Sequence, residues 1–244
     1  SVAIGDWPMD SHECNANRQP GSLADGKILL SEKTRPSQIP YRTLLPKEID
    51  NLISTFCVSS THVAFGTIRV EPTLIQLGEV AGFAVIEANK KNINLADLDI
   101  EKLQIDLVEN CFEISFFNEI GIDNIREQSK AINFLGSKGF FTGYNAKIKE
   151  AISKPIAEQW AKGYVDLIKE DLDANKLAKE IYKLENKQNI SITCTEFTEI
   201  INSELSKSNI DLKFQNLKQY NDEKITIGQA AEIIYSLYKD NNVQ

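Results

Sequence analysis

Histidine, methionine and tryptophan are scarce in this sequence, and its cysteines are thinly spread. The 244 residues include two histidines, one methionine, two tryptophans and four cysteines. The cysteines lie far apart and form no Cys-x-x-Cys pair, which argues against a cysteine-based metal or redox site. Two histidines alone supply too few ligands for a zinc site. No metal site therefore follows from the sequence.

Long hydrophobic runs and an excess of positive charge are also missing. No stretch reaches the roughly 18 uninterrupted apolar residues of a membrane-spanning helix, so we expect no membrane span. The net charge is −8, from 27 basic and 35 acidic residues. This balance argues against nonspecific nucleic-acid binding, which needs a basic face. The 42% hydrophobic content is that of a globular protein with one large or two small cores.

The sequence opens on an apolar, strand-like run, SVAIGD, with no initiator methionine and no signal peptide. A natural N-terminus rarely begins so abruptly. We therefore expect the chain to be the C-terminal part of a longer protein.

Proline and charge are distributed unevenly along the chain. Residues 1–92 contain six of the seven prolines and both histidines, with nine basic and ten acidic residues. Residues 93–244 contain one proline, 18 basic and 25 acidic residues. Such a shift in composition is typical of a domain boundary, so we predict two domains, 1–92 and 93–244.

The first part alternates turn signals with short apolar runs. Residues 51–59 predict a strand that is buried on at least one side, and residues 60–72 predict a polar loop. Pro72 suits the first position of a helix, where its missing N–H is no loss. We expect this helix to extend to about residue 88 and to be buried, because apolar residues lie nearly all round it.

Two glycines, Gly78 and Gly82, form a bare stripe on this helix. The absence of side chains lets a backbone or a flat ligand approach closely. Tight packing of the helix on a strand explains the same stripe without a ligand, and both interpretations stay open.

The second part is predicted to be mainly helical, and three of its helices begin alike. Ile152-Ser153, Ile192-Thr193 and Ile225-Thr226 are each followed, seven residues after the hydroxyl, by a large apolar residue. In the last two, a glutamate or glutamine three residues after the threonine completes a capping box. We therefore expect three related short helical units. Two side-chain environments are predicted here, a core position for Trp160 and a solvated face for Lys176, Lys179 and Lys183.

Four segments in order along the first part resemble a known family. They are residues 5–12 (GDWPMDSH), 41–46 (YRTLLP), 60–72 (STHVAFGTIRVEP) and 77–82 (LGEVAG). Together they resemble the C-terminal stretch of bacterial FAD-dependent oxidoreductases with a glutathione-reductase-like FAD fold, often labelled xanthan-lyase-like. Residues 131–144 (AINFLGSKGFFTGY) look like the helical tail of these proteins and resemble S-layer-homology modules.

The resemblance implies an α+β chain: an incomplete C-terminal piece of an FAD-binding α/β flavoprotein fold followed by a mainly α-helical domain. In that fold a helix N-terminus points at the flavin, and its partial positive charge stabilises negative charge on the reduced ring. The helix after Pro72 is expected to have this role. The implied catalytic residues are His62 and His12, and the implied cofactor-binding residues are Arg42, Thr61, Arg69, Glu71, Pro72, Gly78 and Gly82.

Simpler roles remain open for several of these residues. His62 and His12 suit either proton donation or the bracing of a loop by a hydrogen bond. Arg69 suits either an anionic group or a salt bridge with Glu71, and Arg42 has the same two interpretations. The sequence departs from the family at Glu79-Val80, where Gln-Ala is usual.

One motif of the whole family is missing from this sequence. No G-x-G-x-x-G follows a strand, and the acidic residue expected about 20 positions later is missing too. The implied partner is therefore an N-terminal FAD-binding segment that carries the pyrophosphate cradle. Alone, the chain is expected to be inactive and to retain no FAD.

Two functions of different classes follow. The first is a C-terminal fragment of an FAD-dependent oxidoreductase, whose full-length parent transfers hydride from a small-molecule or carbohydrate substrate to flavin. The alternative is a noncatalytic helical module that binds or anchors to a cell-surface polymer.

Overall fold

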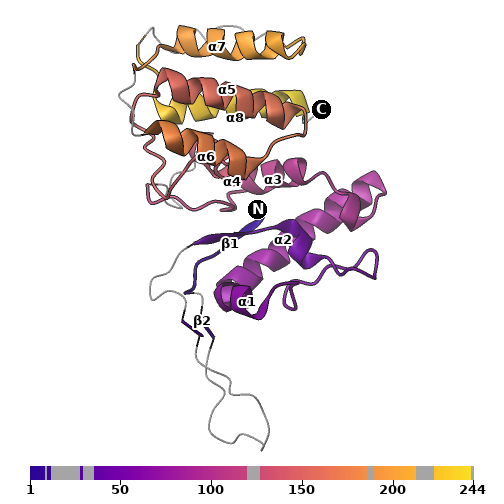
Figure 1. Ribbon diagram of the computed structural model, residues 1–244. Coiled ribbons are helices and arrows are strands. Elements are labelled where there is room, and N and C mark those ends of the chain that lie inside the picture. The colour runs from indigo at the N-terminus through magenta and orange to yellow at the C-terminus, as the bar shows by residue number, and fades with distance from the viewer. Residues whose placement is uncertain are drawn as a thin grey trace, which may run out of the picture. The chain divides into compact units, whose positions relative to one another are not determined.

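The computed structural model describes residues 1–8, 10–11, 28–29, 36–119, 127–185, 190–212 and 223–242. The chain forms two compact units, unit 1 (Ser1–Ser115) and unit 2 (Phe116–Gln244). The fold is α+β and mainly helical, as the sequence predicts (Figure 1). None of the described helices is long and apolar enough to cross a membrane.

Unit 1 combines short strands with three helices. Its elements are β1 (Ala3–Gly5), β2 (Asp10–Ser11), β3 (Ile28–Leu29), β4 (Ser37–Ile39), the 3-10 helix η1 (Tyr41–Leu44), α1 (His62–Ile68), α2 (Glu71–Lys91), the 3-10 helix η2 (Leu95–Asp97) and α3 (Ile100–Glu109). The elements η2 and α3 pack on α2. They therefore belong to unit 1, although they follow the shift in composition near residue 92.

The described strands form two antiparallel pairs, β1 with β4 and β2 with β3. Strand β1 packs against α1 and α2. A Cβ atom at Gly5 would lie 2.9 Å from the carbonyl oxygen of Thr67, so only glycine allows this approach without a shift. The Thr67 hydroxyl donates a 2.7 Å hydrogen bond to the Trp7 carbonyl. These contacts fix the N-terminal strand on the C-terminal half of α1.

The helix predicted after Pro72 is confirmed as α2, which runs from Glu71 to Lys91 with the proline in its first turn. It ends where Asn92 adopts a left-handed conformation, φ 52°. The expectation of burial all round is wrong, because only one face enters the core. That face is formed by Leu74, Leu77, Val80, Ala81, Ala84 and Ala88.

The strand predicted at residues 51–59 is not formed, and this prediction is wrong. The segment is irregular, and its apolar side chains Leu52 and Phe56 are 45% and 67% exposed. Only Val58 is buried in this segment. The apolar run therefore did not indicate a buried strand, because short apolar runs carry no reliable periodicity.

Unit 2 consists of five helices among its described residues. They are α4 (Glu127–Ser137), α5 (Lys154–Ile168), α6 (Ala174–Glu185), α7 (Cys194–Lys207) and α8 (Ile227–Asn242). Helix α4 packs on α8, α6 packs on α5, and α5 packs on α7. Trp160 of α5 is 2% exposed and meets the rings of Phe140 and Phe141 edge-on, which confirms its predicted core position.

The three segments that begin alike meet in a closed ring of backbone hydrogen bonds. The N–H of Ile152 donates to the carbonyl of Ile225, that of Ile225 to Ile192, and that of Ile192 to Ile152. The three isoleucines are at most 2% exposed. Each segment leads directly into one helix, α5, α7 or α8. Unit 2 is thus built from three related units around a pseudo-three-fold centre, as the shared pattern predicts.

The two predicted capping boxes are also present. Thr193 accepts from the Glu196 N–H and donates its own N–H to the Glu196 carboxylate. Thr226 and Gln229 exchange the same two hydrogen bonds. The third hydroxyl, Ser153, makes no capping bond, and its oxygen is buried without a partner. This difference follows from the sequence, because an apolar residue stands three positions after Ser153.

Candidate functional site

His62 and Thr61 lie at the start of a helix rather than in a loop. Thr61 is the N-cap of α1, and its side chain accepts a 3.1 Å hydrogen bond from the Ala64 N–H. His62 is the first residue of α1, and both side chains are exposed. The prediction of a polar loop over residues 60–72 is therefore wrong. Threonine is a favoured N-cap residue, and this preference was not used in predicting the segment.

Arg69 and Glu71 lie at the other end of α1. Arg69 is the C-cap of α1, and Glu71 begins α2 beside Pro72. Seven helical residues span about 10 Å, so α1 separates this pair from His62. Thr61 and His62 therefore lie at one end of this short helix, and Arg69 and Glu71 lie at the other.

Arg42 lies in η1, next to a buried tyrosine. Its side chain is exposed, whereas Tyr41 is 4% exposed and donates a 3.0 Å hydrogen bond to the Leu95 carbonyl. Burial raises the pKa of Tyr41 to about 12. The neutral phenol is a structural tie between η1 and η2, and Arg42 is left at the surface.

The glycine stripe of α2 faces away from the core of unit 1. Gly78 and Gly82 are exposed, and a Cβ atom at either would meet no heavy atom within 4 Å. The expected close packing of this stripe on a strand is therefore not made by the described residues. Three apolar side chains share the exposed surface of α2: Ile75, Val85 and Ile86, which are 65%, 39% and 56% exposed.

The residues of unit 1 fit one edge of FAD but not the whole cofactor. The start of α2 has no side-chain cap at Val70, so its first N–H groups can face an anionic edge. A pyrophosphate, however, needs a glycine-rich turn at a helix start, and the sequence contains none after a strand. His12 lies outside the described residues. The described residues also contain no cluster of three or more metal-ligating side chains.

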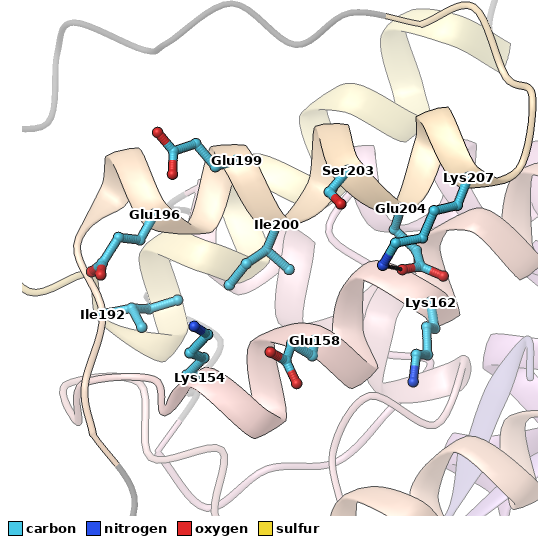
Figure 2. Close-up of a pocket in the computed structure, with 10 residues that line it drawn as sticks. All are labelled: Lys154, Glu158, Lys162, Ile192, Glu196, Glu199, Ile200, Ser203, Glu204 and Lys207. Carbon is cyan, nitrogen blue, oxygen red and sulfur yellow. Dashed lines mark hydrogen bonds and ion pairs between the residues drawn. The ribbon is translucent and has the colours of Figure 1, made fainter.

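A second candidate site is a groove between α5 and α7 in unit 2. It has a volume of about 480 Å³ and is open to solvent (Figure 2). Ile200 of α7 points toward α5, and Ile192 contributes a second apolar side chain. The polar lining comes from Lys154, Glu158, Lys162, Glu196, Glu199, Ser203, Glu204 and Lys207.

Some of the charged groups in the groove are paired, and others make no ion pair with the described residues. Glu204 and Lys207 form a 3.1 Å ion pair on α7. Lys154, Glu158 and Lys162 follow one another at every fourth residue of α5, and within the described part of the chain their side chains make no ion pair. This row was not predicted from the sequence, although charged residues spaced four apart lie on one face of a helix.

Comparison with known proteins concerns the first part of the chain. No curated protein and no solved structure matches the sequence. One family model does match, and it extends from β1 into α3, including the residues around His62 and the whole of α2. Residues 1–107 are thus similar to the family described as FAD dependent oxidoreductase.

Proposed function

We propose that unit 1 is the C-terminal part of the FAD-binding domain of an oxidoreductase, and that a segment outside this sequence supplies the remainder. Bound FAD would accept a hydride at its N5 atom from a substrate C–H bond, which oxidises the substrate and reduces the flavin. The family match over residues 1–107 carries this proposal. The proposed substrate class is a small molecule or a carbohydrate, and the xanthan-lyase-like resemblance is the reason for including the carbohydrate.

The start of α2 supports a position beside the flavin ring. Its first turn has no side-chain cap, and Glu71 and Pro72 are exposed. Free N–H groups and about half a positive charge at a helix start favour an anion. In the complete domain this end of α2 would stabilise negative charge on the reduced ring. The negative carboxylate of Glu71 in the same turn would repel the negative charge on the reduced ring. This side chain must therefore point away from the ring or pair with a cation.

The exposed side of α2 supports contact with the rest of the domain. It combines Ile75, Val85 and Ile86 with the two unfilled positions at Gly78 and Gly82. Apolar area of this kind is normally covered by another protein surface. We assign it to the FAD-binding segment, because glycines let a second backbone lie close to the helix.

The test compares two proteins, residues 1–244 and a longer protein that begins upstream of Ser1 in the gene. Each is loaded with FAD and separated from free flavin by gel filtration. We expect visible flavin absorbance in the longer protein and none in residues 1–244. A Gly82→Leu substitution in the longer protein should lower flavin retention, because the added side chain fills the stripe assigned to the FAD-binding segment. Stoichiometric flavin on residues 1–244 would contradict the proposal.

A second function is proposed for unit 2, as a noncatalytic module that binds a cell-surface polymer. The observation that favours it is the α5–α7 groove, where Lys154, Glu158 and Lys162 of α5 make no ion pair with the described residues. Both helices begin at the hydrogen-bonded ring. A rigid scaffold of this kind holds charged groups in place for an extended ligand.

Retention on immobilised cell-wall polysaccharide tests this second function. The whole chain should be retained, and Lys154→Gln together with Lys162→Gln should reduce retention. Lys149→Gln serves as the control, because Lys149 is an exposed lysine outside the groove. Passage of the unaltered chain through the column without delay would exclude this function.

A further inference from the structure

The outer face of α5 carries a row of charges that alternate in sign. The row consists of Lys154, Glu158, Lys162 and Asp166, which follow one another at intervals of four residues. All four are exposed. Within the described part of the chain their side chains make no ion pair, although this spacing would allow pairs along the helix. The charges of the row therefore stay available for a partner.

The order of these charges is complementary to itself when it is reversed. If a second copy of α5 lies antiparallel to the first, Lys154 comes opposite Asp166 of the second copy, and Glu158 comes opposite its Lys162. Two-fold symmetry repeats each of these contacts. Every position of the row then faces an opposite charge. A parallel copy would instead set each charge against its own kind, which the sequence of charges disfavours.

Helix α7 borders the same face and runs in the same direction as α5. Both helices start at the hydrogen-bonded ring, so their first residues lie at one end of the groove. Figure 2 shows Lys154 and Glu196 at that end, Lys162 and Lys207 at the other end, and Ile200 between them. The groove therefore has two ends that a two-fold rotation would bring together.

The charges of α7 agree with the same rotation. It would bring Glu196 toward Lys207 of the second copy, which is a pair of opposite charges. Glu199 would approach Glu204 of the second copy, but Glu204 is already paired with Lys207 at 3.1 Å on its own helix. Ile200, which is partly buried, lies near the middle of the face. The apolar contribution is small and exposed ion pairs are individually weak, so we expect a weak, reversible dimer.

We propose that the chain self-associates through this face of unit 2, as a two-fold symmetric dimer in which the α5 helices of two copies are antiparallel. The occupant is a second copy because the charge order of the row matches its own reverse. This dimer does not rest on either of the functions proposed above. It would cover the α5–α7 groove, so a second copy and the polymer of the second function would compete for one surface.

Sedimentation equilibrium of residues 1–244 over a range of protein concentrations, at low salt, tests the dimer. Exposed ion pairs are least screened under this condition. Lys162→Glu sets two carboxylates opposite each other in both symmetry-related contacts, so it should weaken dimerisation by about tenfold or more. Adding Glu158→Lys to the same chain restores opposite charges in both contacts and should recover the dimer. Circular dichroism checks that each variant is folded.

Lys176→Glu is the matched control for Lys162→Glu. Lys176 is an exposed lysine of α6 that does not line the groove, and its substitution changes the net charge by the same amount. Its dimerisation should equal that of the unaltered chain. Equal weakening by the two substitutions would assign the effect to net charge and overturn the proposal.

Two further results would also overturn the dimer. One is an unaltered chain that stays monomeric at every concentration, and the other is a double variant that dimerises no better than Lys162→Glu alone. No polysaccharide is present in this experiment, so neither result bears on the second function. Retention of a strictly monomeric chain on the polysaccharide column would leave that function standing without the dimer.

Discussion

The glycines of α2 and α5 occupy opposite environments. At Gly82 of unit 1, an added Cβ atom would meet no heavy atom within 4 Å. At Gly163 of unit 2, it would lie 2.6 Å from the Leu177 Cδ2 atom and 3.1 Å from the Phe140 Cζ atom. Gly163 allows α6 to lie close to α5, whereas Gly78 and Gly82 of α2 have no such close neighbour among the described residues. Helix α5 is thus packed against its neighbour α6, whereas the outer face of α2 is exposed.

The two tryptophans provide the largest expected contrast. Trp160 of unit 2 is 2% exposed, whereas Trp7 of unit 1 is 45% exposed. Trp160→Ala should destabilise unit 2 by about 3–5 kcal/mol, because it removes a large buried ring and leaves a cavity. Trp7→Ala should change stability by less than about 1 kcal/mol. Urea unfolding with hydrogen exchange as a local probe measures both, and equal losses would contradict this contrast.

The glycine pair should give changes of opposite sign. Gly163→Ala is expected to destabilise unit 2 by about 1–3 kcal/mol, because the added methyl group overpacks the contact with Leu177. Gly82→Ala should stabilise unit 1 by about 0.5–1 kcal/mol, because alanine favours the helix and has room there. Thermal unfolding of residues 1–244 measures both shifts. A destabilising Gly82→Ala would show that this face is covered within the chain.

Helix caps within unit 2 offer a smaller contrast. Thr193→Ala should cost about 1 kcal/mol, because it removes the capping bond to the Glu196 N–H. Ser153→Ala should change stability by less than about 0.5 kcal/mol, because the Ser153 hydroxyl makes no capping bond and is buried without a partner. The two variants are compared by their urea midpoints. Similar losses of stability would show that the Thr193 capping bond contributes no more than the Ser153 hydroxyl does.

The smallest expected effect is the pH dependence of the contact between α2 and α3. Burial raises the pKa of Glu87, but ion pairs with Lys102 at 3.2 Å and Lys91 at 3.4 Å outweigh it, so the pKa lies below its ordinary value of 4.5. A lowered folded-state pKa contributes stability above pH 4.5, which is lost as the pH falls through the folded-state value. The pKa of the nearby Asp106 is raised, first by burial and then by Glu87, which gives a contribution of opposite sign.

Glu87→Gln should therefore reduce the loss of unit 1 stability on acidification from about pH 6 to about pH 3, a range that passes below the ordinary pKa of 4.5, by about 1 kcal/mol or less. Urea unfolding at several pH values measures this change. If the variant loses as much stability on acidification as the unaltered chain, the pH dependence of unit 1 stability comes from other carboxylates. Unit 2 serves as the internal reference, because it does not contain this cluster.

Local signals in the sequence predicted much of the helical framework. Pro72 marked the start of α2, and the threonines of the two capping boxes marked α7 and the turn into α8. The shared isoleucine-hydroxyl pattern predicted three related units. These features depend on atoms within a few residues of one another, which is why they can be read from the sequence.

The candidate site in unit 1 was predicted less well. Because a strand was predicted at residues 51–59, the residues around His62 were predicted to be the loop that follows it. In the structure they form the helix α1. The roles of His62, Arg42, Thr61, Arg69, Glu71, Pro72, Gly78 and Gly82 remain predictions. The observed positions of Thr61 and His62 differ from the predicted ones because a short apolar run fits a strand or an irregular segment equally well. Only the tertiary contacts of the run distinguish the two.

By itself the sequence determined where α2, α5, α7 and α8 begin, that three segments of unit 2 are related, and that no glycine-rich pyrophosphate cradle follows a strand. Only the tertiary structure decided which glycines lie against a close neighbour and which face of α2 stays exposed. It also decided that Phe141 and Tyr182 border one hollow. Caps and turns are set by atoms close together in the chain. Packing instead depends on residues such as Gly139 and Ala174, which are far apart in the sequence and meet only in the folded protein.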